Sequence, residues 1–355
     1  MYKRQHPLAV DAGGEQAGPG NDSTNNTIGM SVLIRSQGRR LTTLADALLC
    51  LIGQENQDFE VLLLAHCVPA EAQRALEALV RDLPPDLAHR TRLILVEGGG
   101  RSRPLNVGIA RAQGSYVTVL DDDDLVLGNW TSVLLETART YPGRVVRGVA
   151  VEQDIAEDPA DPQRFRTLSL PRAVYPSDYD MLSHLVRNYT PLMALAFPRS
   201  VFRDLGLRFD EELPVVEDWD LQLRAVSVCG IATVPEVIAV YRRWATGSAS
   251  HTQHDQDQWR AAERRVIQRL DSQPHLLPAG GVSAIRDLVT RVNPPERGAS
   301  DEAETLWESQ QELARARAQL DFVYQSASWR STALLRVAAR TARAGLQRIR
   351  QGKRT

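Results

Sequence analysis

Four apolar runs of strand length dominate the first third of the chain, and segments with helical spacing separate them. The runs cover residues 30–34, 59–64, 91–96 and 115–120. The spacing predicts intervening helices over 41–52, 70–82 and 104–112. Because nearly every residue of each run is apolar and the connections are short, the pattern is typical of parallel strands with helices on both faces. The sequence therefore predicts an α/β fold with a mostly parallel central sheet flanked by helices.

The second half of the chain has a more mixed pattern. It predicts a strand over 144–152, an irregular excursion over 158–177, a helix over 213–228, and a strand pair or one turned strand over 231–241.

The domain organisation follows from these elements and from the breaker residues between them. Residues 1–28 are rich in Gly, Asn, Asp and Ser, and we expect a disordered leader there. We expect one folded domain over 29–251, a helical segment and linker over 252–300, and a long helix with a basic amphipathic tail over 301–355. The last two parts form a C-terminal helical extension.

Composition is that of a globular protein, with 43% hydrophobic and 24% charged residues and a net charge of −2. Cys50, Cys67 and Cys229 lack the spacing of a metal site or a disulfide framework, so we expect reduced thiols in a cytoplasmic compartment. The N-terminus lacks the apolar stretch of a signal peptide, and no run reaches the roughly 20 apolar residues of a membrane span.

The fourth apolar run ends in four consecutive aspartates, Asp121 to Asp124. Adjacent carboxylates repel one another at the end of a buried strand unless a cation binds there, and a hard divalent ion suits oxygen ligands. A block of like charge is more often a solvated loop. Here Leu120 before the run and Leu125 after it favour a metal site, and Mg²⁺ or Mn²⁺ typically brings substrate phosphates with it.

Polar residues also follow the other three runs. Arg35 follows the first, His66 and Cys67 the second, and residues 97–100 the third. The carboxyl ends of parallel strands lie at one edge of a sheet, where ligands collect. The sequence therefore predicts a single crevice that contains the aspartates.

A second acidic motif, Glu217-Asp218-Trp219-Asp220, lies in the helix predicted over 213–228. Acidic residues in a first turn suit the helix dipole and need no further role. The functional interpretation is a general base, in which one carboxylate takes a proton from an incoming hydroxyl while the neighbouring acid and Trp219 position it.

In this order the motifs resemble those of the family 2 inverting glycosyltransferases of the bacterial polysaccharide type, which have the Rossmann-like GT-A fold. The resemblance is carried by residues 31–34, 41–52, 54, 58–63, 106–108, 112–117, 120–124, 206–210 and 217–220. It covers roughly residues 29–251, and each motif alone is weak, whereas the ordered set is specific.

The resemblance implies roles for individual residues. Asp121 and Asp123 match the family's Asp-x-Asp motif. Asp123 would bind Mn²⁺ or Mg²⁺, which holds the diphosphate of a nucleotide-sugar, and Asp121 would lie near the ribose within reach of the ion. Asp218 matches the catalytic base, with Glu217 beside it.

The resemblance also implies nucleotide or phosphate contacts. They are expected from Arg35, Arg101, Arg103, Asn106 and Asp122. His251 is expected as a further metal or diphosphate contact. A solvated loop is the alternative for Arg101 and Arg103, and a surface histidine is the alternative for His251.

Two strand ends depart from the family pattern. The second run continues as Ala65-His66-Cys67 where relatives commonly have an acidic pair that contacts the base, and the first continues as Arg35-Ser36-Gln37-Gly38. The base is therefore open, and UDP, dTDP and GDP donors all remain candidates.

The C-terminal tail is strongly basic, with eight Arg or Lys residues and no acidic residue from Phe322 to Thr355. A basic amphipathic helix of this kind can lie on the anionic inner face of the plasma membrane. The alternative is a helix that packs on the protein or on a dimer partner. Leu306, Leu313 and Leu320 form a partial heptad that makes a homodimer a candidate, and no nucleic-acid-binding pattern accompanies the basic residues.

The sequence thus predicts an inverting, metal-dependent hexosyl- or deoxyhexosyltransferase. It would move a sugar from a nucleotide-sugar to a glycan or lipid-linked glycan acceptor in cell-surface polysaccharide biosynthesis. One alternative is a catalytically inactive scaffold of the same fold in a polysaccharide assembly complex, which the altered strand ends support. The other is a nucleotidyltransferase, whose Gly-rich loop the segment from Arg35 to Arg40 only faintly resembles.

Overall fold

The computed structural model describes residues 28–245, 255–273 and 280–292. The chain divides into two compact units, Met1–Gly281 and Val282–Thr355. Residues 282–292, which belong to helix α11 (Gly281–Val292), are the described part of the second unit. The leader predicted over 1–28 (apart from Ile28) and the helix and tail predicted over 301–355 lie outside the described residues.

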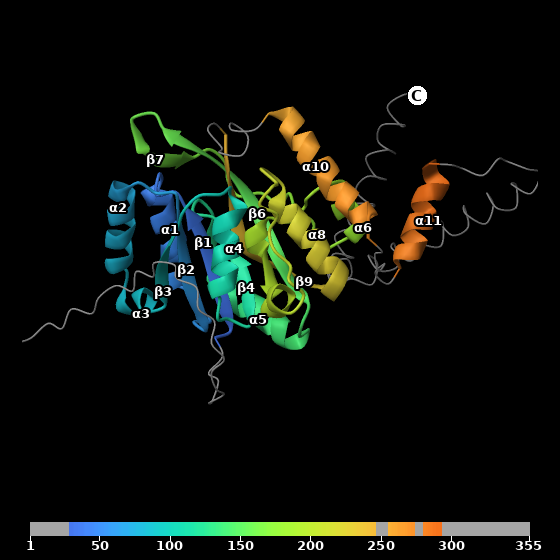
Figure 1. Cartoon of the computed structure of the whole chain (residues 1–355), viewed down its shortest axis with the longest axis horizontal. Helices are drawn as coiled ribbons and strands as arrows, with labels where there is room; N and C mark the ends of the chain where they lie inside the picture. The colour runs from blue at the N-terminus through green and yellow to red at the C-terminus, as the bar shows by residue number, and fades with distance from the viewer. Residues whose placement is uncertain (1–27, 246–254, 274–279, 293–355) are drawn as a thin grey trace, which may run out of the picture. The chain divides into compact units, whose positions relative to one another are not determined.

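The described part of the first unit is built on a nine-stranded sheet (Figure 1). The strand order is β3-β2-β1-β4-β8-β6-β9-β5, and β7 pairs with β6. The strands are β1 (Met30–Ser36), β2 (Phe59–His66), β3 (Thr91–Val96), β4 (Tyr116–Val119), β5 (Leu125–Val126), β6 (Val145–Asp158), β7 (Asp161–Thr167), β8 (Leu195–Pro198) and β9 (Ile231–Trp244).

Most of these strands point the same way. β1 pairs in parallel with β2 and β4, β2 with β3, and β6 with β9. β5, β7 and β8 run antiparallel to the strands that they pair with. The prediction of an α/β fold with a mostly parallel sheet is confirmed.

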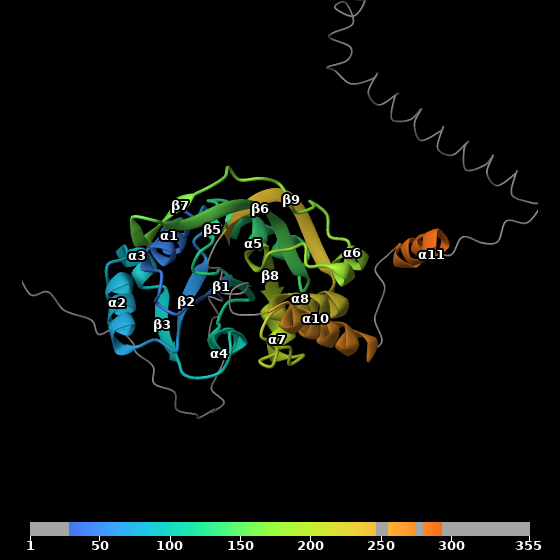
Figure 2. The ribbon, with the colours of Figure 1, turned by 90° about the horizontal axis from the view of Figure 1, so that it is seen from above.

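Helices cover both faces of this sheet (Figures 1 and 2). They are α1 (Leu41–Ile52), α2 (Ala70–Arg81), α3 (Pro85–Ala88), α4 (Ser102–Arg111), α5 (Trp130–Thr140), α6 (Met181–Val186), α7 (Arg199–Arg203), α8 (Glu217–Cys229) and α10 (Gln256–Asp271), with a 3₁₀ turn η1 (Leu192–Ala194). Val32 and Ile34 of β1 belong to a core shared with α1, α2 and α5, whereas Leu33 belongs to a core shared with α4, α7 and α8. Both alternating faces of the strand are buried, which explains its unbroken apolar sequence.

A third, smaller core joins α10 to α8 (Figure 1). Val266 and Leu270 of α10 pack with Trp219 and Leu223 of α8. Arg269 of α10 adds ion pairs to Asp210 and Asp220. The segment that carries the second acidic motif is therefore held between the sheet and α10.

One prediction about the second half was wrong, and the structure decides between two alternatives for a second region. The excursion expected over 158–177 instead begins with a hairpin, because β6 runs on to Asp158 and β7 returns along it. Of the two alternatives for the region after Ile231, the single strand is correct: β9 has 14 residues, and its pairing with β6 contains two register shifts. The sequence did not reveal the hairpin, because the stretch from Glu157 to Arg166 is rich in charged residues and proline and has the composition of a loop.

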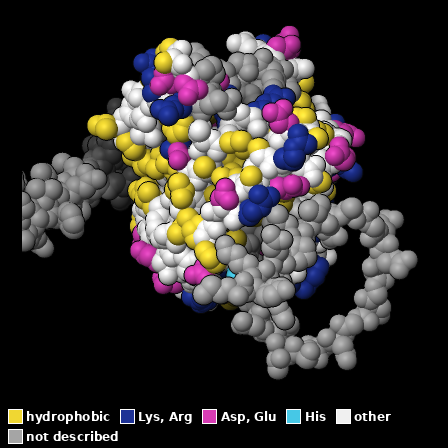
Figure 3. Space-filling view, turned by 90° about the vertical axis from the view of Figure 1, so that its left-hand side faces the viewer, with side chains coloured by type: hydrophobic (Ala, Val, Ile, Leu, Met, Phe, Trp, Pro, Cys, Tyr) yellow, Lys and Arg dark blue, Asp and Glu magenta, His cyan; other side chains and the backbone are white. Residues whose placement is uncertain are grey.

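The face of the molecule that carries α2 shows acidic and basic side chains interspersed with apolar ones (Figure 3). The described residues visible there do not form a patch of one charge sign. The polar groups that gather in one place lie instead at the carboxyl ends of β1 and β4.

Gly114, at the entry to β4, allows two backbones to approach closely. A Cβ atom at this position would lie 2.4 Å from Ser31 N and 2.5 Å from the carbonyl carbon of Met30. Because these are backbone atoms of the central strand, Gly114→Ala is expected to lower the free energy of unfolding by about 1–3 kcal/mol, measured by urea denaturation. Gly53→Ala is the matched control, since its Cβ would meet no atom within 4 Å. Equal stabilities of the two variants would contradict this account of the β1–β4 contact.

Candidate active site

Arg35, near the end of β1, draws three separate segments together. Its Nε donates to Asp121 Oδ1 at 2.9 Å, and its Nη1 donates to Glu217 Oε1 at 2.9 Å. Arg101, just before α4, brings a second guanidinium to the same carboxylate, with its Nε 2.7 Å from Glu217 Oε1. The aspartate run after β4 and the Glu217-Asp218 motif at the start of α8 therefore lie on either side of a shared arginine.

The four aspartates have different environments. Asp121 accepts from Arg35, and Asp122 interacts with the Ser36 side chain. Asp123 Oδ2 accepts from Trp244 Nε1 at 2.7 Å. Asp124 is 1% exposed and accepts from the Arg242 backbone N–H at 2.7 Å, so it joins the end of β4 to β9. The first three line the site, and the fourth is part of the fold.

The pKa values of these carboxyls reflect their crowding. Burial opposes ionisation of Asp121, but the charges of Arg35 and Arg101 outweigh it and lower its pKa. Burial and the charge of Asp123 raise the pKa of Asp122 to about 7. Burial and the charge of Asp121 raise the pKa of Asp123. Nearby positive charge favours the ionised form of such groups, so a cation beside them would stabilise the cluster.

These residues fit a divalent cation that the substrate helps to bind. Within residues 28–245, 255–273 and 280–292, no three His, Cys, Asp or Glu side chains gather in the geometry of a metal site. Mg²⁺ commonly takes only one or two protein carboxylates, together with water and substrate phosphates. Asp121 and Asp123 supply carboxylates of this kind, and the predicted further ligand, His251, lies outside the described residues.

Asp218 lies in the first turn of α8, next to the buried Glu217. The backbone N–H of Trp219 donates to its Oδ1 at 2.8 Å, and Asn188 Nδ2 donates to its Oδ2 at 3.1 Å. Burial and the charge of Glu217 raise its pKa to about 6, although Arg101 partly offsets them. A carboxylate with this pKa is still ionised at neutral pH and accepts a proton more readily than an ordinary aspartate.

The backbone immediately before this motif is strained. Val216 has φ 57° and ψ 21°, in the left-handed region. For a β-branched residue this conformation costs on the order of 1–3 kcal/mol and persists only where the surroundings enforce it. Val216 packs in the core shared by α8 and α10, so tertiary contacts hold the turn from which α8 begins.

Asn188 is a site residue that the sequence analysis missed. Its Oδ1 accepts from the Thr190 backbone N–H at 3.0 Å, which fixes the amide so that Nδ2 faces Asp218. Thr190 is in turn held by the buried side chains of Arg147 and His184, at 3.0 and 2.9 Å from its hydroxyl. The sequence offered no signal for this network, because a loop Asn and a distant Arg form no recognisable motif.

Two predicted contact residues are engaged elsewhere in the structure. Asn106 exchanges hydrogen bonds with the backbone of Phe209, donating to its carbonyl at 2.9 Å and accepting from its N–H at 2.9 Å. This side chain fixes the loop before α8, because its amide matches both backbone groups. Arg103 Nε donates to the Glu97 carbonyl at 3.1 Å, and its Nη1 lies 3.7 Å from Glu211. Arg35 and Arg101 do reach the site, where they bind carboxylates.

Comparison with known proteins identifies the family. Residues 31–206 match the family model of glycosyl transferase family 2. This segment of the chain is a glycosyl transferase family 2 domain. The matched segment contains Arg35, Arg101 and all four aspartates, while Glu217 and Asp218 lie 11 and 12 residues beyond its end. The prediction of a family 2 glycosyltransferase is confirmed.

A curated relative and two solved structures are similar to the chain. The succinoglycan biosynthesis protein ExoO of Rhizobium meliloti (strain 1021) is 29% identical over 211 residues, which are 56% of this chain and 56% of that protein. The chain therefore spans little more than half the length of this relative. TarS 1–349 of S. aureus in complex with UDP-GlcNAc is 16% identical, with a TM-score of 0.48 over 62% of this chain and 60% of that one. The complex of the same protein with UDP is 16% identical, with a TM-score of 0.46 over 61% and 60%.

Proposed function

We propose that the chain is an inverting, metal-dependent glycosyltransferase that moves a sugar from a nucleoside diphosphate sugar to a glycan acceptor. The observation that carries the proposal is the Arg35 bridge between Asp121 and Glu217. This bridge brings the candidate base, Asp218, to the same site as Asp121 and Asp123, whose carboxylates suit a cation. Membership of glycosyl transferase family 2 supports the reaction class.

The donor side of the reaction needs positive charge. A bound divalent ion would stabilise the negative charge that grows on the leaving diphosphate. Asp121 and Asp123 would hold this ion. Arg35 and Arg101 add two guanidinium groups beside the same position, and both form ion pairs with Glu217.

The acceptor side needs a base. Asp218 takes the proton of the acceptor hydroxyl as the oxygen attacks the anomeric carbon. The new bond forms on the face opposite to the diphosphate, the carbon–oxygen bond to the diphosphate breaks, and the configuration of the anomeric carbon inverts. Asn188 and the Trp219 N–H hold the two carboxylate oxygens, so the base keeps one orientation throughout.

A panel of UDP-, dTDP- and GDP-sugars, each with Mn²⁺ or with EDTA, tests the proposal by thermal shift and by release of nucleoside diphosphate. At least one donor is expected to raise the melting temperature by about 5 °C when present at 100 times its Kd, and only with metal. The same donor should be hydrolysed slowly in the absence of acceptor. A panel in which no donor shifts the transition would overturn the proposal.

The pH dependence of kcat/KM is expected to report Asp218. Since burial and Glu217 raise its pKa to about 6, the ionised base is lost as the pH falls through that value. The rate should be constant at neutral pH and fall about tenfold per unit below pH 6, instead of below pH 4 as for an ordinary aspartate. The donor-induced thermal shift at each pH separates donor binding from ionisation of the base. A rate that stays constant down to pH 5 would contradict the assignment.

One observation favours the inactive scaffold as a second candidate. Arg35 already neutralises Asp121 and Glu217, so the structure supplies an internal cation where the proposal places a metal. A scaffold would show no metal-dependent hydrolysis of any donor, whereas an enzyme in which the ion joins or displaces the guanidinium would show it. The hydrolysis assay above therefore separates the two.

The cellular setting is proposed by analogy with the relative named for succinoglycan biosynthesis, as cell-surface polysaccharide synthesis with a glycan or lipid-linked glycan acceptor. Among the described residues, no helix is both long and apolar enough to cross a bilayer. We propose peripheral contact with the inner face of the plasma membrane through the basic tail. Flotation of the full chain with anionic liposomes, compared with a chain ending at Ser300, measures this contact, and equal flotation of the two would exclude a role for the tail.

A further inference from the structure

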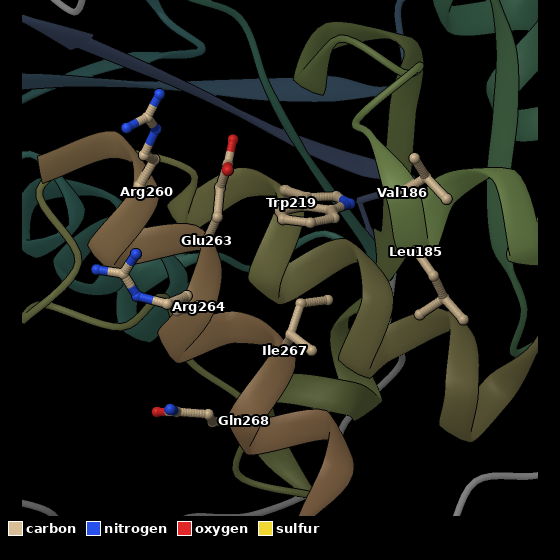
Figure 4. A pocket seen from close by; sticks show the side chains of 8 residues that line it. All are labelled: Leu185, Val186, Trp219, Arg260, Glu263, Arg264, Ile267 and Gln268. Carbon is tan, nitrogen blue, oxygen red and sulfur yellow. The ribbon is translucent and has the colours of Figure 1, made fainter. Parts of the chain in front are cut away.

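A cavity of about 370 Å³ opens between α6, α8 and α10 (Figure 4). Its lining includes Trp219 of α8 and Val186 of α6. Trp219 directly follows Asp218 in the chain, and Val186 lies two residues before Asn188, which donates to Asp218. The cavity therefore borders the turn of α8 that carries the proposed base, although Asp218 itself is not among the lining residues.

The lining combines an apolar floor with charged groups on one helix. Leu185, Trp219 and Ile267 supply apolar surface, and Figure 4 shows Trp219 and Ile267 between α10 and the helix that carries Leu185. The indole N–H of Trp219 donates to the His184 carbonyl, which fixes the plane of the ring. A rigid aromatic side chain beside aliphatic groups is the usual floor of a small-ligand site.

The arginines of α10 fall into two sets with different partners. Arg265 and Arg269 pair with Asp210, and they tie the helix to the loop before α8. Arg260 and Arg264, one turn apart, line the cavity instead. Among the residues that the structure describes, Arg260 has one ion pair, a contact of 4.0 Å to Asp257, and 65% of its side chain is exposed, so its guanidinium is accessible to a ligand.

We infer that this cavity is the acceptor subsite, and that it binds a glycan that carries an anionic group. The inference rests on the proposed function. A sugar ring packs on the apolar floor next to Asp218, and a carboxylate or phosphate on the acceptor binds Arg260 and Arg264, whose planar guanidinium groups match both anions. Glu263, on the same helix, accepts hydrogen bonds from sugar hydroxyls.

Acceptor probes of matched size test this inference with the full chain and the donor that the thermal-shift panel selects. The probes are a disaccharide ending in glucuronic acid, a disaccharide phosphate, and the neutral disaccharide. At least one charged probe is expected to bind about ten times more tightly than the neutral one, measured by saturation-transfer NMR titration and by acceptor KM. The first two probes distinguish an acidic sugar from a phosphate as the source of the anion.

The variant Arg260→Gln/Arg264→Gln is expected to reduce the preference for the charged probe to about twofold or less, mainly through KM. Arg74→Gln/Arg81→Gln, which changes two exposed arginines of α2, is the matched control and should keep the full preference. Equal affinity of the wild-type chain for charged and neutral probes, or an unchanged preference in the α10 variant, overturns the inference. A donor-induced thermal shift in the same wild-type sample shows that the proposed function stands even then, and its absence would count against that function instead.

Discussion

Replacing Asp218 by Asn is expected to reduce turnover by about 10²- to 10⁴-fold, the range in which a positioned general base contributes to catalysis. The amide has nearly the shape of the carboxylate, and its oxygen can still accept from the Trp219 N–H or from Asn188. It cannot take a proton from an acceptor hydroxyl. Because the substitution removes the proton acceptor and leaves Arg35, Asp121 and Glu217 in place, the donor-induced thermal shift should remain within about 1 °C of the wild-type value.

The measurement is single-turnover transfer at saturating donor, accompanied by the thermal shift of the same preparation. Asp82→Asn, at the end of α2, is the matched control, because it makes the same chemical change at an exposed position. A variant at position 218 that turns over within twofold of the wild type would show that another group takes the proton. Loss of both turnover and the thermal shift would point to a disturbed site rather than a missing base.

The parallel strands at the centre of the fold could be predicted from the sequence, because a strand that is buried on both faces is an unbroken apolar run. β1, β2 and β3 are apolar along almost their whole length, and each was predicted at nearly its observed bounds. The hairpin of β6 and β7 was not, because it lies at the margin of the sheet and its strands carry charged residues. Cross-strand pairs such as Ile155 with Thr167 stabilise it, and such pairs leave no period in the sequence.

Some residues of the candidate site could also be predicted from the sequence, whereas others are recognised only in the fold. Asp121, Asp123 and Asp218 lie in short motifs and could be named from the sequence, although their roles remain proposals. Arg35 could be placed at a strand end, but its pairing with a carboxylate 182 positions away depends on the fold. Asn188 and Trp244 act through single hydrogen bonds to these aspartates, and neither residue type is diagnostic in a loop or at a strand end.

Replacing Asp123 by Asn is expected to lower kcat/KM by about 10²- to 10³-fold, comparable to the loss of one group that stabilises transition-state charge. The Mn²⁺ concentration for half-maximal activity should rise by about tenfold or more, since the ion loses a charged ligand. The Asn oxygen still accepts from Trp244 Nε1, so the fold around β9 should be kept. Burial raises the pKa of Asp123, and removing its charge relieves repulsion with Asp121, so the variant should be at least as stable as the wild type without metal.

Asp124→Asn is the contrasting control, because Asp123 is proposed to bind the ion whereas its neighbour Asp124 stabilises the fold. Asp124 accepts from the Arg242 backbone N–H and is buried, so its substitution should affect the free energy of unfolding more than the Mn²⁺ dependence. In the wild type, EDTA should abolish transfer and added Mn²⁺ should restore it. Full activity in EDTA would mean that Arg35 and Arg101 alone stabilise the leaving diphosphate. In that case the aspartate run would serve to orient Arg35, and Asp123→Asn would leave the rate nearly unchanged. The two substitutions together therefore decide whether a metal ion or an arginine supplies the positive charge at this site.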